Sequence, residues 1–197
     1  MELKELVIGS TNKGKIKDLL ALIPYKNIKV TLASDLNYPD PEEIGNTFEE
    51  NALIKAMYYG KLTELPSLGD DSGIIFNQLS SFPGINTKRF ADECGGYKEA
   101  FDSLNEMLKS HASPHPAEFI TSLVLYMPDK NITITGSGSL KGEFCYPPRG
   151  TGFGYLPVFI PEGYNKTLAE LEEEEKNKIS HRSSAVKDLF SKLKEIN

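Results

Sequence analysis

The sequence has 197 residues, enough for one α/β domain or two closely packed lobes with a sizeable core. Hydrophobic residues make up 39% and charged residues 25%, the balance of a water-soluble globular protein. The net charge is −6 and no basic face is visible, so nonspecific binding to nucleic acid is not expected.

The cysteine content and the hydropathy pattern indicate the compartment. Cys94 and Cys145 lie far apart and in no metal-like spacing, so we expect no disulfide framework and a reducing environment. The chain has neither a long apolar span nor a charged leader followed by an apolar segment. We therefore expect a cytoplasmic protein that has no membrane partner.

The N-terminal segment predicts a strand, a tight polar loop and a helix. Residues 6–8 are apolar, the polar loop spans residues 9–15, and apolar residues then recur at helical spacing from Ile16 to Ile23. Pro24 ends the pattern. Unpaired backbone N–H groups at such a helix start, together with two lysines, would form a cradle for phosphate.

The loop at residues 9–15 fits the phosphate-binding pattern G-x-x-x-x-G-K, with one departure. The hydroxyl side chain that would bind Mg²⁺ after the lysine is replaced by Ile16. A magnesium ion would therefore need ligands from elsewhere in the chain. The alternative is an ordinary polar turn between a strand and a helix, because short motifs often match by chance.

A second strand is predicted over residues 28–33, followed by a proline-broken acidic stretch at residues 35–43. The capping box at residues 47–50 then begins a helix. Its expected buried side chains are Phe48, Ala52, Ala56 and Met57. Asn51 and Lys55 lie one turn apart, so both could face one ligand, whereas the alternative for Lys55 is a solvated surface lysine.

Two adjacent carboxylates, Asp70 and Asp71, stand among glycines at the border of a strand predicted over residues 74–76. Like charges held together repel each other and raise a pKa unless a cation lies between them. A metal ion in this position would supply what the loop at residues 9–15 lacks. The alternative is a simple turn, which aspartate, serine and glycine often form.

The middle of the chain predicts a loop at residues 82–90 and a core-facing helix over residues 97–108. Apolar β-rich runs at residues 119–127 and 132–135 predict a hairpin. Its second strand is expected to continue toward Phe144. The glycines in that continuation indicate either bends or a close approach of another backbone.

The C-terminal part begins with a glycine loop at residues 147–155, whose aromatic side chains suit either stacking on a flat ring or anchoring in the core. A second capping box at residues 167–170 predicts a short helix with a solvated acidic run at residues 172–175. Ser180 is expected to cap the last helix. Its expected buried side chains are Val186, Leu189, Phe190 and Leu193. The pair His181 and Arg182 in its first turn favours a bound anion.

Five motifs occur in a fixed order along nearly the whole chain. They span residues 10–15, 47–56, 70–73, 152–155 and 175–182. Together they resemble the inosine triphosphate pyrophosphatase family, the non-canonical purine nucleoside triphosphate pyrophosphatases. This resemblance implies an α/β fold in which helices flank an elongated mixed β-sheet. It also implies one domain over residues 1–197 with two lobes and a nucleotide cleft between them, and a homodimer.

The resemblance also implies an activity, which is Mg²⁺-dependent hydrolysis of the small-molecule substrates ITP, dITP and XTP to a monophosphate and pyrophosphate. Asp71 would be the catalytic proton acceptor, and Glu42 and Asp71 would bind Mg²⁺, with Glu43 and Asp70 as close neighbours. The implied ligands of the triphosphate are Ser10, Thr11, Asn12, Lys13, Gly14, Lys15 and Lys55, and Ser72 would touch the substrate. The implied base pocket comprises Phe153, Gly154, Tyr155, Leu156, Lys176, His181 and Arg182.

Leu156 departs from the family pattern, which usually has aspartate at this position. If that carboxylate recognises the base, the preference for 6-oxo purines changes, and Leu156→Asp should raise kcat/KM for ITP. If only the backbone N–H is used, little changes. One alternative is therefore a nucleotide-binding or sensing module with weak or altered pyrophosphatase activity. Another is a housekeeping pyrophosphatase that acts on other modified nucleotides.

Overall fold

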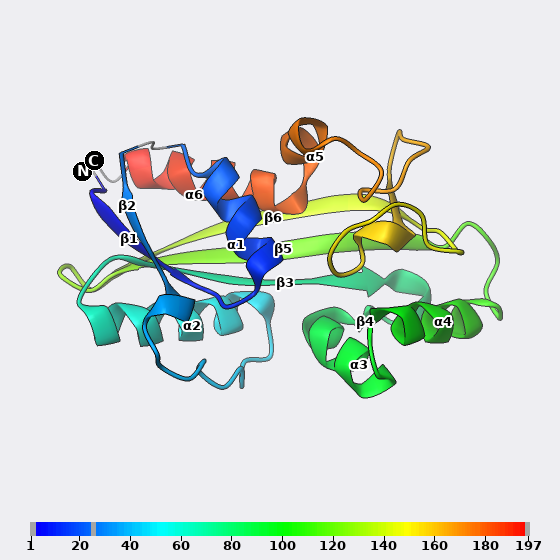
Figure 1. Ribbon diagram of the computed structural model, residues 1–197, viewed down its shortest axis with the longest axis horizontal. Coiled ribbons are helices and arrows are strands. Elements are labelled where there is room, and N and C mark those ends of the chain that lie inside the picture. The colour runs from blue at the N-terminus through cyan, green and yellow to red at the C-terminus, as the bar shows by residue number, and fades with distance from the viewer. Residues whose placement is uncertain (1–2, 25–26, 196–197) are drawn as a thin grey trace. The chain divides into compact units, whose positions relative to one another are not determined.

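The computed structural model describes residues 3–24 and 27–195. Its strands are β1 (Glu5–Gly9), β2 (Lys29–Leu32), β3 (Ser67–Phe76), β4 (Phe82–Pro83), β5 (Pro116–Met127), β6 (Ile132–Phe144) and β7 (Phe159–Pro161). Its helices are α1 (Lys13–Leu22), α2 (Phe48–Thr63), α3 (Thr87–Cys94), α4 (Tyr97–Leu108), α5 (Glu173–Ile179) and α6 (His181–Glu195) (Figure 1). None of these helices is long and apolar enough to span a membrane.

The strands of the described residues form one mixed sheet in the order β2-β1-β3-β5-β6-β7, with β4 paired to β3. β1 runs parallel to β2 and to β3, whereas β4 is antiparallel to β3 and β7 is antiparallel to β6. A connection between parallel strands of one sheet needs a crossover. α1 lies in the connection from β1 to its neighbour β2, and α2 lies in the connection from β2 past β1 to β3. The predicted mixed α/β fold is therefore confirmed, as is the hairpin of β5 and β6.

The chain divides into two compact units. Unit 1 contains residues 1–71, 121–138 and 181–197, and unit 2 contains residues 72–120 and 139–180. β3, β5 and β6 contribute residues to both units. The nucleotide cleft between two lobes stays a prediction.

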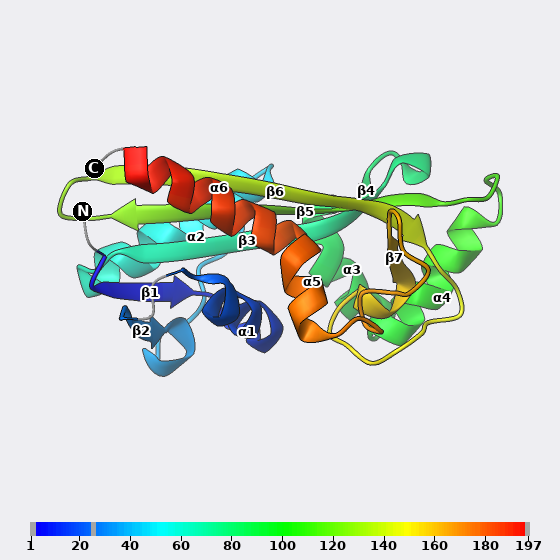
Figure 2. The same ribbon diagram turned by 90° about the horizontal axis from the view of Figure 1, so that it is seen from above.

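In unit 1 the sheet is covered on both faces, by α1 and α6 on one side and by α2 on the other (Figures 1 and 2). Successive side chains of a strand point to opposite faces. Leu6 and Ile8 therefore pack with α1 and α6, whereas Val7 packs with Tyr59 of α2. Burial on both faces explains the continuous apolar run of β1. The four apolar residues predicted for the buried side of α6 all belong to this core.

Two glycines of β6 allow α6 to lie directly on the sheet. A Cβ added at Gly136 would lie 2.4 Å from the carbonyl oxygen of Ala185. One added at Gly138 would lie 2.1 Å from the carbonyl oxygen of His181. Backbone atoms cannot move aside as a flexible side chain can, so these positions require glycine. Close backbone approach, one of the two expectations, is confirmed, and it fixes the start of α6 against β6.

Unit 2 has its own apolar core, built from α3, α4, β7 and parts of β3, β5 and β6. Tyr155 anchors it: its ring meets the rings of Tyr97 and Phe101 edge-on, and its hydroxyl donates to the carbonyl oxygen of Thr87 at 3.2 Å. The prediction of a loop at residues 82–90 is wrong in part, because β4 and the first turn of α3 lie there.

The capping box at residues 167–170 forms a turn instead of a helix start. The backbone N–H of Thr167 donates to Glu170 Oε2 at 2.7 Å, as a capping box requires. The Thr167 hydroxyl, however, donates to the carbonyl oxygen of Arg149 at 2.9 Å instead of accepting from a helix N–H. α5 begins only at Glu173, and the acidic residues in its first turn are exposed as predicted.

Candidate functional site

The N-terminus of α1 is capped by the loop that precedes it. Asn12 is the N-cap, and its Oδ1 accepts hydrogen bonds from the N–H groups of Gly14 at 3.0 Å and Lys15 at 3.2 Å. Ser10 Oγ accepts the N–H of Asn12 at 3.3 Å. The prediction of unpaired N–H groups is therefore wrong for residues 14 and 15, because an asparagine N-cap satisfies these donors. What this loop offers an anion is the charge of its lysines, and Lys13 is exposed.

Asp70 and Asp71 lie inside β3 and not at its border, so the alternative of a simple turn is wrong. Glycine and aspartate have low strand propensity, but packing on both faces overrides that preference. A Cβ added at Gly69 would lie 1.9 Å from the carbonyl oxygen of Ala52, which shows how closely α2 lies on the strand. Because neighbouring strand residues face opposite sides, the two carboxylates have different partners.

Asp70 faces α1 and α6, where two cations neutralise it. Its Oδ1 lies 2.9 Å from Lys15 Nζ, and its Oδ2 accepts from Arg182 Nε at 2.7 Å. Arg182 Nη1 also donates to Asp18 Oδ2 at 2.9 Å. Burial disfavours the charged form of Asp70, but Arg182 and Lys15 outweigh burial and hold the pKa of Asp70 well below its usual range. We call Lys15, Asp18, Asp70 and Arg182 the Arg182 network.

The Arg182 network supplies the anion that the first turn of α6 was expected to bind. The carboxylates of Asp18 and Asp70 both contact the guanidinium group, and the Arg182 side chain is only 2% exposed. The sequence placed Arg182 in the base pocket, whereas the structure places it between α1 and β3. Its role in base recognition stays a prediction. Sequence reasoning missed Asp18, whose helical position on the buried side of α1 was the available signal.

Asp71 faces α2. Lys55 Nζ lies 3.4 Å from Asp71 Oδ1 and donates to the carbonyl oxygen of Asp70 at 3.0 Å. Asn51 Nδ2 donates to Asp71 Oδ2 at 3.3 Å, and Lys15 Nζ lies 4.0 Å from Asp71 Oδ1. Burial raises the pKa of Asp71, although Lys55 and Lys15 oppose the rise. A buried carboxylate with a raised pKa, beside cations that can hold a substrate, has the properties of a general base.

Lys55 joins Asp71 to Glu43, because its Nζ also lies 2.7 Å from Glu43 Oε1. Burial lowers the pKa of Lys55, but Asp71 and Glu43 together outweigh burial and raise it above its ordinary value. The Lys55 side chain is 12% exposed, so the alternative of a solvated surface lysine is wrong. Asn51 and Lys55 both contact Asp71, and the prediction that they face one ligand stays a prediction.

The described residues contain no cluster of three histidine, cysteine or acidic side chains that would bind a metal ion unaided. Glu43 and Asp71 do share one cation, the ammonium group of Lys55. Two carboxylates fit Mg²⁺, which keeps several waters and is commonly held by one or two carboxylates plus substrate phosphates. Glu42, the predicted ligand, and Glu43 are both exposed, and Glu43 is the one that contacts Lys55 beside Asp71. The role of Glu42 as a metal ligand stays a prediction.

A polar stripe on α2 binds the acidic loop, residues 36–46. Its members, spaced by four residues on one helix face, are Asn51, Lys55 and Tyr59. Their loop partners, in the same order, are Gly45 at 2.8 Å, Glu43 at 2.7 Å and Asp40 at 2.6 Å. Asp40 Oδ2 also accepts from the Thr11 hydroxyl at 2.6 Å. Sequence reasoning missed Asp40 and Tyr59, although continuing the spacing of Asn51 and Lys55 leads to Tyr59.

The residues predicted for the base pocket lie mostly in unit 2. Phe153 is 36% exposed in its loop, and Gly154 has a φ of +60°. Tyr155 and Leu156 are 2% and 7% exposed and belong to the unit 2 core, so Tyr155 has the anchoring role that was the alternative. Lys176 is partly exposed in α5. His181, a further member, is the buried first residue of α6, and Ser72, which was predicted to touch the substrate, follows Asp71 in β3.

The burial of Leu156 bears on the expected gain from Leu156→Asp. Its side chain packs among the apolar residues of the unit 2 core. A carboxylate there would be buried in apolar surroundings, and its charged form would be strongly disfavoured. The backbone N–H of Leu156 donates to the Phe153 carbonyl oxygen at 3.4 Å. We therefore expect Leu156→Asp to reduce stability, and a gain in base recognition is no longer favoured.

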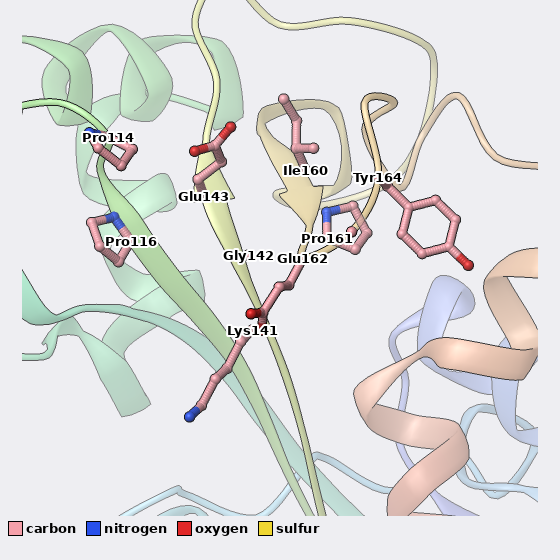
Figure 3. Close-up of a pocket in the computed structure, with 10 residues that line it drawn as sticks. Pro114, Pro116, Lys141, Gly142, Glu143, Ile160, Pro161, Glu162 and Tyr164 are labelled. Atoms are coloured by element: carbon pink, nitrogen blue, oxygen red, sulfur yellow. The ribbon is translucent and has the colours of Figure 1, made fainter.

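Unit 2 also contains a cavity of about 420 Å³. Figure 3 shows Pro114 and Pro116 on one side of it and Ile160 and Tyr164 on the other, with β6 between them. Its charged lining residues are Lys141, Glu143 and Glu162. None of the residues predicted for the functional site lines this cavity.

Comparison with known proteins places this arrangement in a family. The Ham1 family model matches residues 6–192. The dITP/XTP pyrophosphatase of Ruegeria pomeroyi is 41% identical over 92% of this chain and 91% of its own length, and that of Aquifex aeolicus is 39% identical over 96% of both chains. The solved HAM1 protein of Coxiella burnetii is 36% identical, covers 98% of this chain and 99% of its own, and superposes with a TM-score of 0.84. The predicted family is confirmed, and the chain belongs to the Ham1 family.

Proposed function

We propose that this protein is a nucleoside triphosphate pyrophosphatase that hydrolyses ITP, dITP and XTP to the monophosphate and pyrophosphate. The observation that carries the proposal is the convergence of Lys15 and Lys55 on the buried carboxylate of Asp71. The names of the relatives that are 41% and 39% identical, both dITP/XTP pyrophosphatases, support the same activity. Its role would be to remove deaminated purine nucleotides from the nucleotide pool.

The reaction needs a water molecule placed in line with the α-phosphorus, a group that accepts its proton, and charge to stabilise the departing pyrophosphate. Asp71 is the proton acceptor, because its raised pKa keeps it basic while neighbouring amides and ammonium groups hold it in place. Lys15 and Lys55 hold phosphate oxygens in exchange for part of their carboxylate contacts. Lys13, exposed at the same loop, adds positive charge for the outer phosphates.

We propose Glu43 and Asp71 as the residues that hold Mg²⁺. When bound, the ion would neutralise charge on the departing pyrophosphate oxygens. Lys55 supports this pair, since one cationic group already lies within contact of both carboxylates. Glu42, the adjacent exposed glutamate and the ligand that the family resemblance implies, is the comparison position. A higher Mg²⁺ concentration required for half-maximal activity in Glu43→Gln but not in Glu42→Gln would support the assignment.

The base preference rests on hydrogen-bond donors. Hypoxanthine and xanthine present a carbonyl group at C6, where adenine presents an amino group, so a site built from donors rejects adenine. Lys176, His181 and Arg182 are the donors that the family resemblance implies. A donor left without a partner costs roughly 1–3 kcal/mol, which corresponds to about 5- to 150-fold in kcat/KM. We also propose that the protein is cytoplasmic and that it forms a homodimer. Light scattering of the purified protein tests the homodimer.

The deciding experiment measures pyrophosphate release from ITP, XTP, GTP, dUTP and ATP with and without Mg²⁺, using Asp71→Asn as the inactive control. We expect ITP and XTP to be hydrolysed faster than ATP, and only with the metal. GTP, whose base also has a carbonyl at C6, tests whether groups beyond C6 are recognised. Binding of ITP without turnover would instead support a sensing module. Faster hydrolysis of dUTP would support a pyrophosphatase for other modified nucleotides.

A further inference from the structure

We infer that Asp40 is a positioning residue that ties the phosphate loop, residues 9–15, to the acidic loop, and this inference rests on the proposed function. Each oxygen of its carboxylate accepts one hydrogen bond. Oδ2 accepts from the Thr11 hydroxyl at 2.6 Å, and Oδ1 accepts from the Tyr59 hydroxyl at 2.6 Å. Both distances are those of hydrogen bonds from a hydroxyl to a charged carboxylate, the stronger class.

Tyr59 provides the fixed end of this connection. Its side chain is fully buried, packs with Val7 of β1, and meets the ring of Tyr58 edge-on with centroids 5.0 Å apart. A Cβ added at Gly9 would lie 2.9 Å from Tyr59 Cδ2, so the ring lies directly against the start of the phosphate loop. The ring therefore supports this loop from within, while its hydroxyl reaches the acidic loop.

The contacts form a closed circuit. It runs from Gly9 to the Tyr59 ring, from the Tyr59 hydroxyl to Asp40, and from Asp40 back to Thr11 in the phosphate loop. Glu43 stands three residues beyond Asp40 in the acidic loop and contacts Lys55. Residues 36–46 form neither helix nor strand, so side-chain contacts of this kind position them. Asp40 thus couples the group that holds phosphates to the segment that carries Glu43.

Tyr59→Phe is the sharpest variant, because it removes one hydroxyl, keeps the buried ring and leaves the charge unchanged. Full burial prevents Tyr59 from touching a substrate, so an effect on binding must act through Asp40. Tyr58→Phe, the same substitution at the next residue of α2, is the matched control. We expect Tyr59→Phe to weaken binding of inorganic triphosphate by roughly three- to tenfold, the effect of one hydrogen bond. We expect Tyr58→Phe to leave it unchanged.

A double-mutant cycle tests whether the hydroxyls of Thr11 and Tyr59 both act through Asp40. Thr11→Val removes the other hydroxyl that Asp40 binds, and Thr11→Ser, which keeps it, should lie closer to wild type. If both hydroxyls act through Asp40, Thr11→Val combined with Tyr59→Phe weakens triphosphate binding by less than the product of the two single effects. In ITP hydrolysis, the variants should raise KM by more than they lower kcat. Multiplicative effects would show that Thr11 contacts the substrate independently and would overturn the inference.

Amide hydrogen exchange gives a readout that needs no substrate. The N–H of Gly45 donates to Asn51 Oδ1 at 2.8 Å, and that of Asn46 donates to Glu50 Oε2 at 2.6 Å. In Tyr59→Phe these amides should exchange faster than in Tyr58→Phe, while the amides inside α2 keep their protection. Equal exchange in both variants overturns the inference. Absence of pyrophosphate release from ITP by wild type would instead refute the proposed function, and exchange would still decide the role of Asp40.

Discussion

Asp70 and Asp71 are adjacent in the sequence, but their side chains face opposite sides of the sheet and their pKa values are shifted in opposite directions. Asp70 is enclosed by Arg182 and Lys15, and its pKa lies well below the usual range. Asp71 is nearly as buried, yet its pKa is raised, because Lys55 and Lys15 compensate its burial incompletely. The alternation of a strand sends one carboxylate toward α1 and α6 and the other toward α2.

The comparison separates stabilisation from chemistry. A carboxylate that its partners fully compensate stabilises the fold and is too weakly basic to accept a proton. A carboxylate that they compensate incompletely costs stability in its charged form and remains reactive. If Asp71 is the base that we propose, one strand carries a structural anion and a reactive anion at adjacent positions. Each prediction below tests one side of this contrast.

The largest effect is expected for Asp71→Asn. Loss of a positioned general base reduces kcat by about 10²- to 10⁴-fold. The amide should leave the melting temperature unchanged or higher, since the charged carboxylate is the costly form. Pyrophosphate release from ITP and thermal unfolding, measured on the same preparation, test both statements. A variant that hydrolyses ITP at a near-native rate would exclude Asp71 as the base.

Arg182→Met tests whether the buried ion pairs of the Arg182 network stabilise the fold. Removing the cation leaves Asp18 and Asp70 buried without their main partner, and breaking a buried ion pair costs about 3–5 kcal/mol in the free energy of unfolding. Lys88→Met is the control, because Lys88 pairs with Asp92 at the surface and should contribute less than about 1 kcal/mol. Urea unfolding measures both. If stability is retained and only the ratio of ITP to GTP hydrolysis changes, Arg182 recognises the base and does not support the fold.

Lys15 contacts both carboxylates and tests whether the two sides are independent. Lys15→Ala should weaken binding of ITP by roughly ten- to a hundredfold, because charge-assisted contacts contribute about 1.5–3 kcal/mol. The loss for IMP should be smaller, since the charge lies near the outer phosphates. Lys29→Ala, at an exposed ion pair of unit 1, serves as control. Equal losses for ITP and IMP would place Lys15 away from the pyrophosphate end.

The smallest effect is a contrast in pH dependence. The folded pKa of Asp70 is lowered, so its stabilisation is present above about pH 4 and is lost as the pH falls further. The folded pKa of Asp71 is raised, so its contribution is complete below about pH 4 and is lost as the pH rises. On acidification, the melting-temperature deficit of Asp70→Asn should shrink, whereas the melting temperature of wild type should rise relative to that of Asp71→Asn. Parallel curves would contradict the contrast.

The parts of the fold that could be predicted from the sequence are those in which a single pattern determines the secondary structure. The apolar spacing of the last helix and the paired β-rich runs of the hairpin were sufficient, because each signal is local and long. The predicted strand began at residue 74, whereas β3 begins at Ser67, because the first half of β3 contains glycine and aspartate, which strands disfavour. Its strand state follows from packing between helices on both faces, and no single-segment propensity contains that information.

For the candidate site, sequence reasoning identified Asp71, Lys15 and Lys55 and their convergence. It did not find Asp18, which is 164 positions from Arg182, or Asp40, whose two partners belong to a loop and a helix. Such pairs become visible only when the topology brings their elements together. The environment of Leu156 could not be predicted either, because no local pattern indicates that this side chain packs in the unit 2 core. Its role in base recognition stays a prediction.

The Arg182 network also has a consequence for biosynthesis. Asp70 leaves the ribosome 112 residues before the arginine that neutralises it. At about 5–20 residues per second, translation needs roughly 6 to 22 s to supply that arginine. During this interval Asp70 has Lys15 but not Arg182 as a partner, so the final docking of β3 waits for the first turn of α6. A ribosome stalled before codon 182 would therefore hold a chain with incomplete charge pairing, open to proteases.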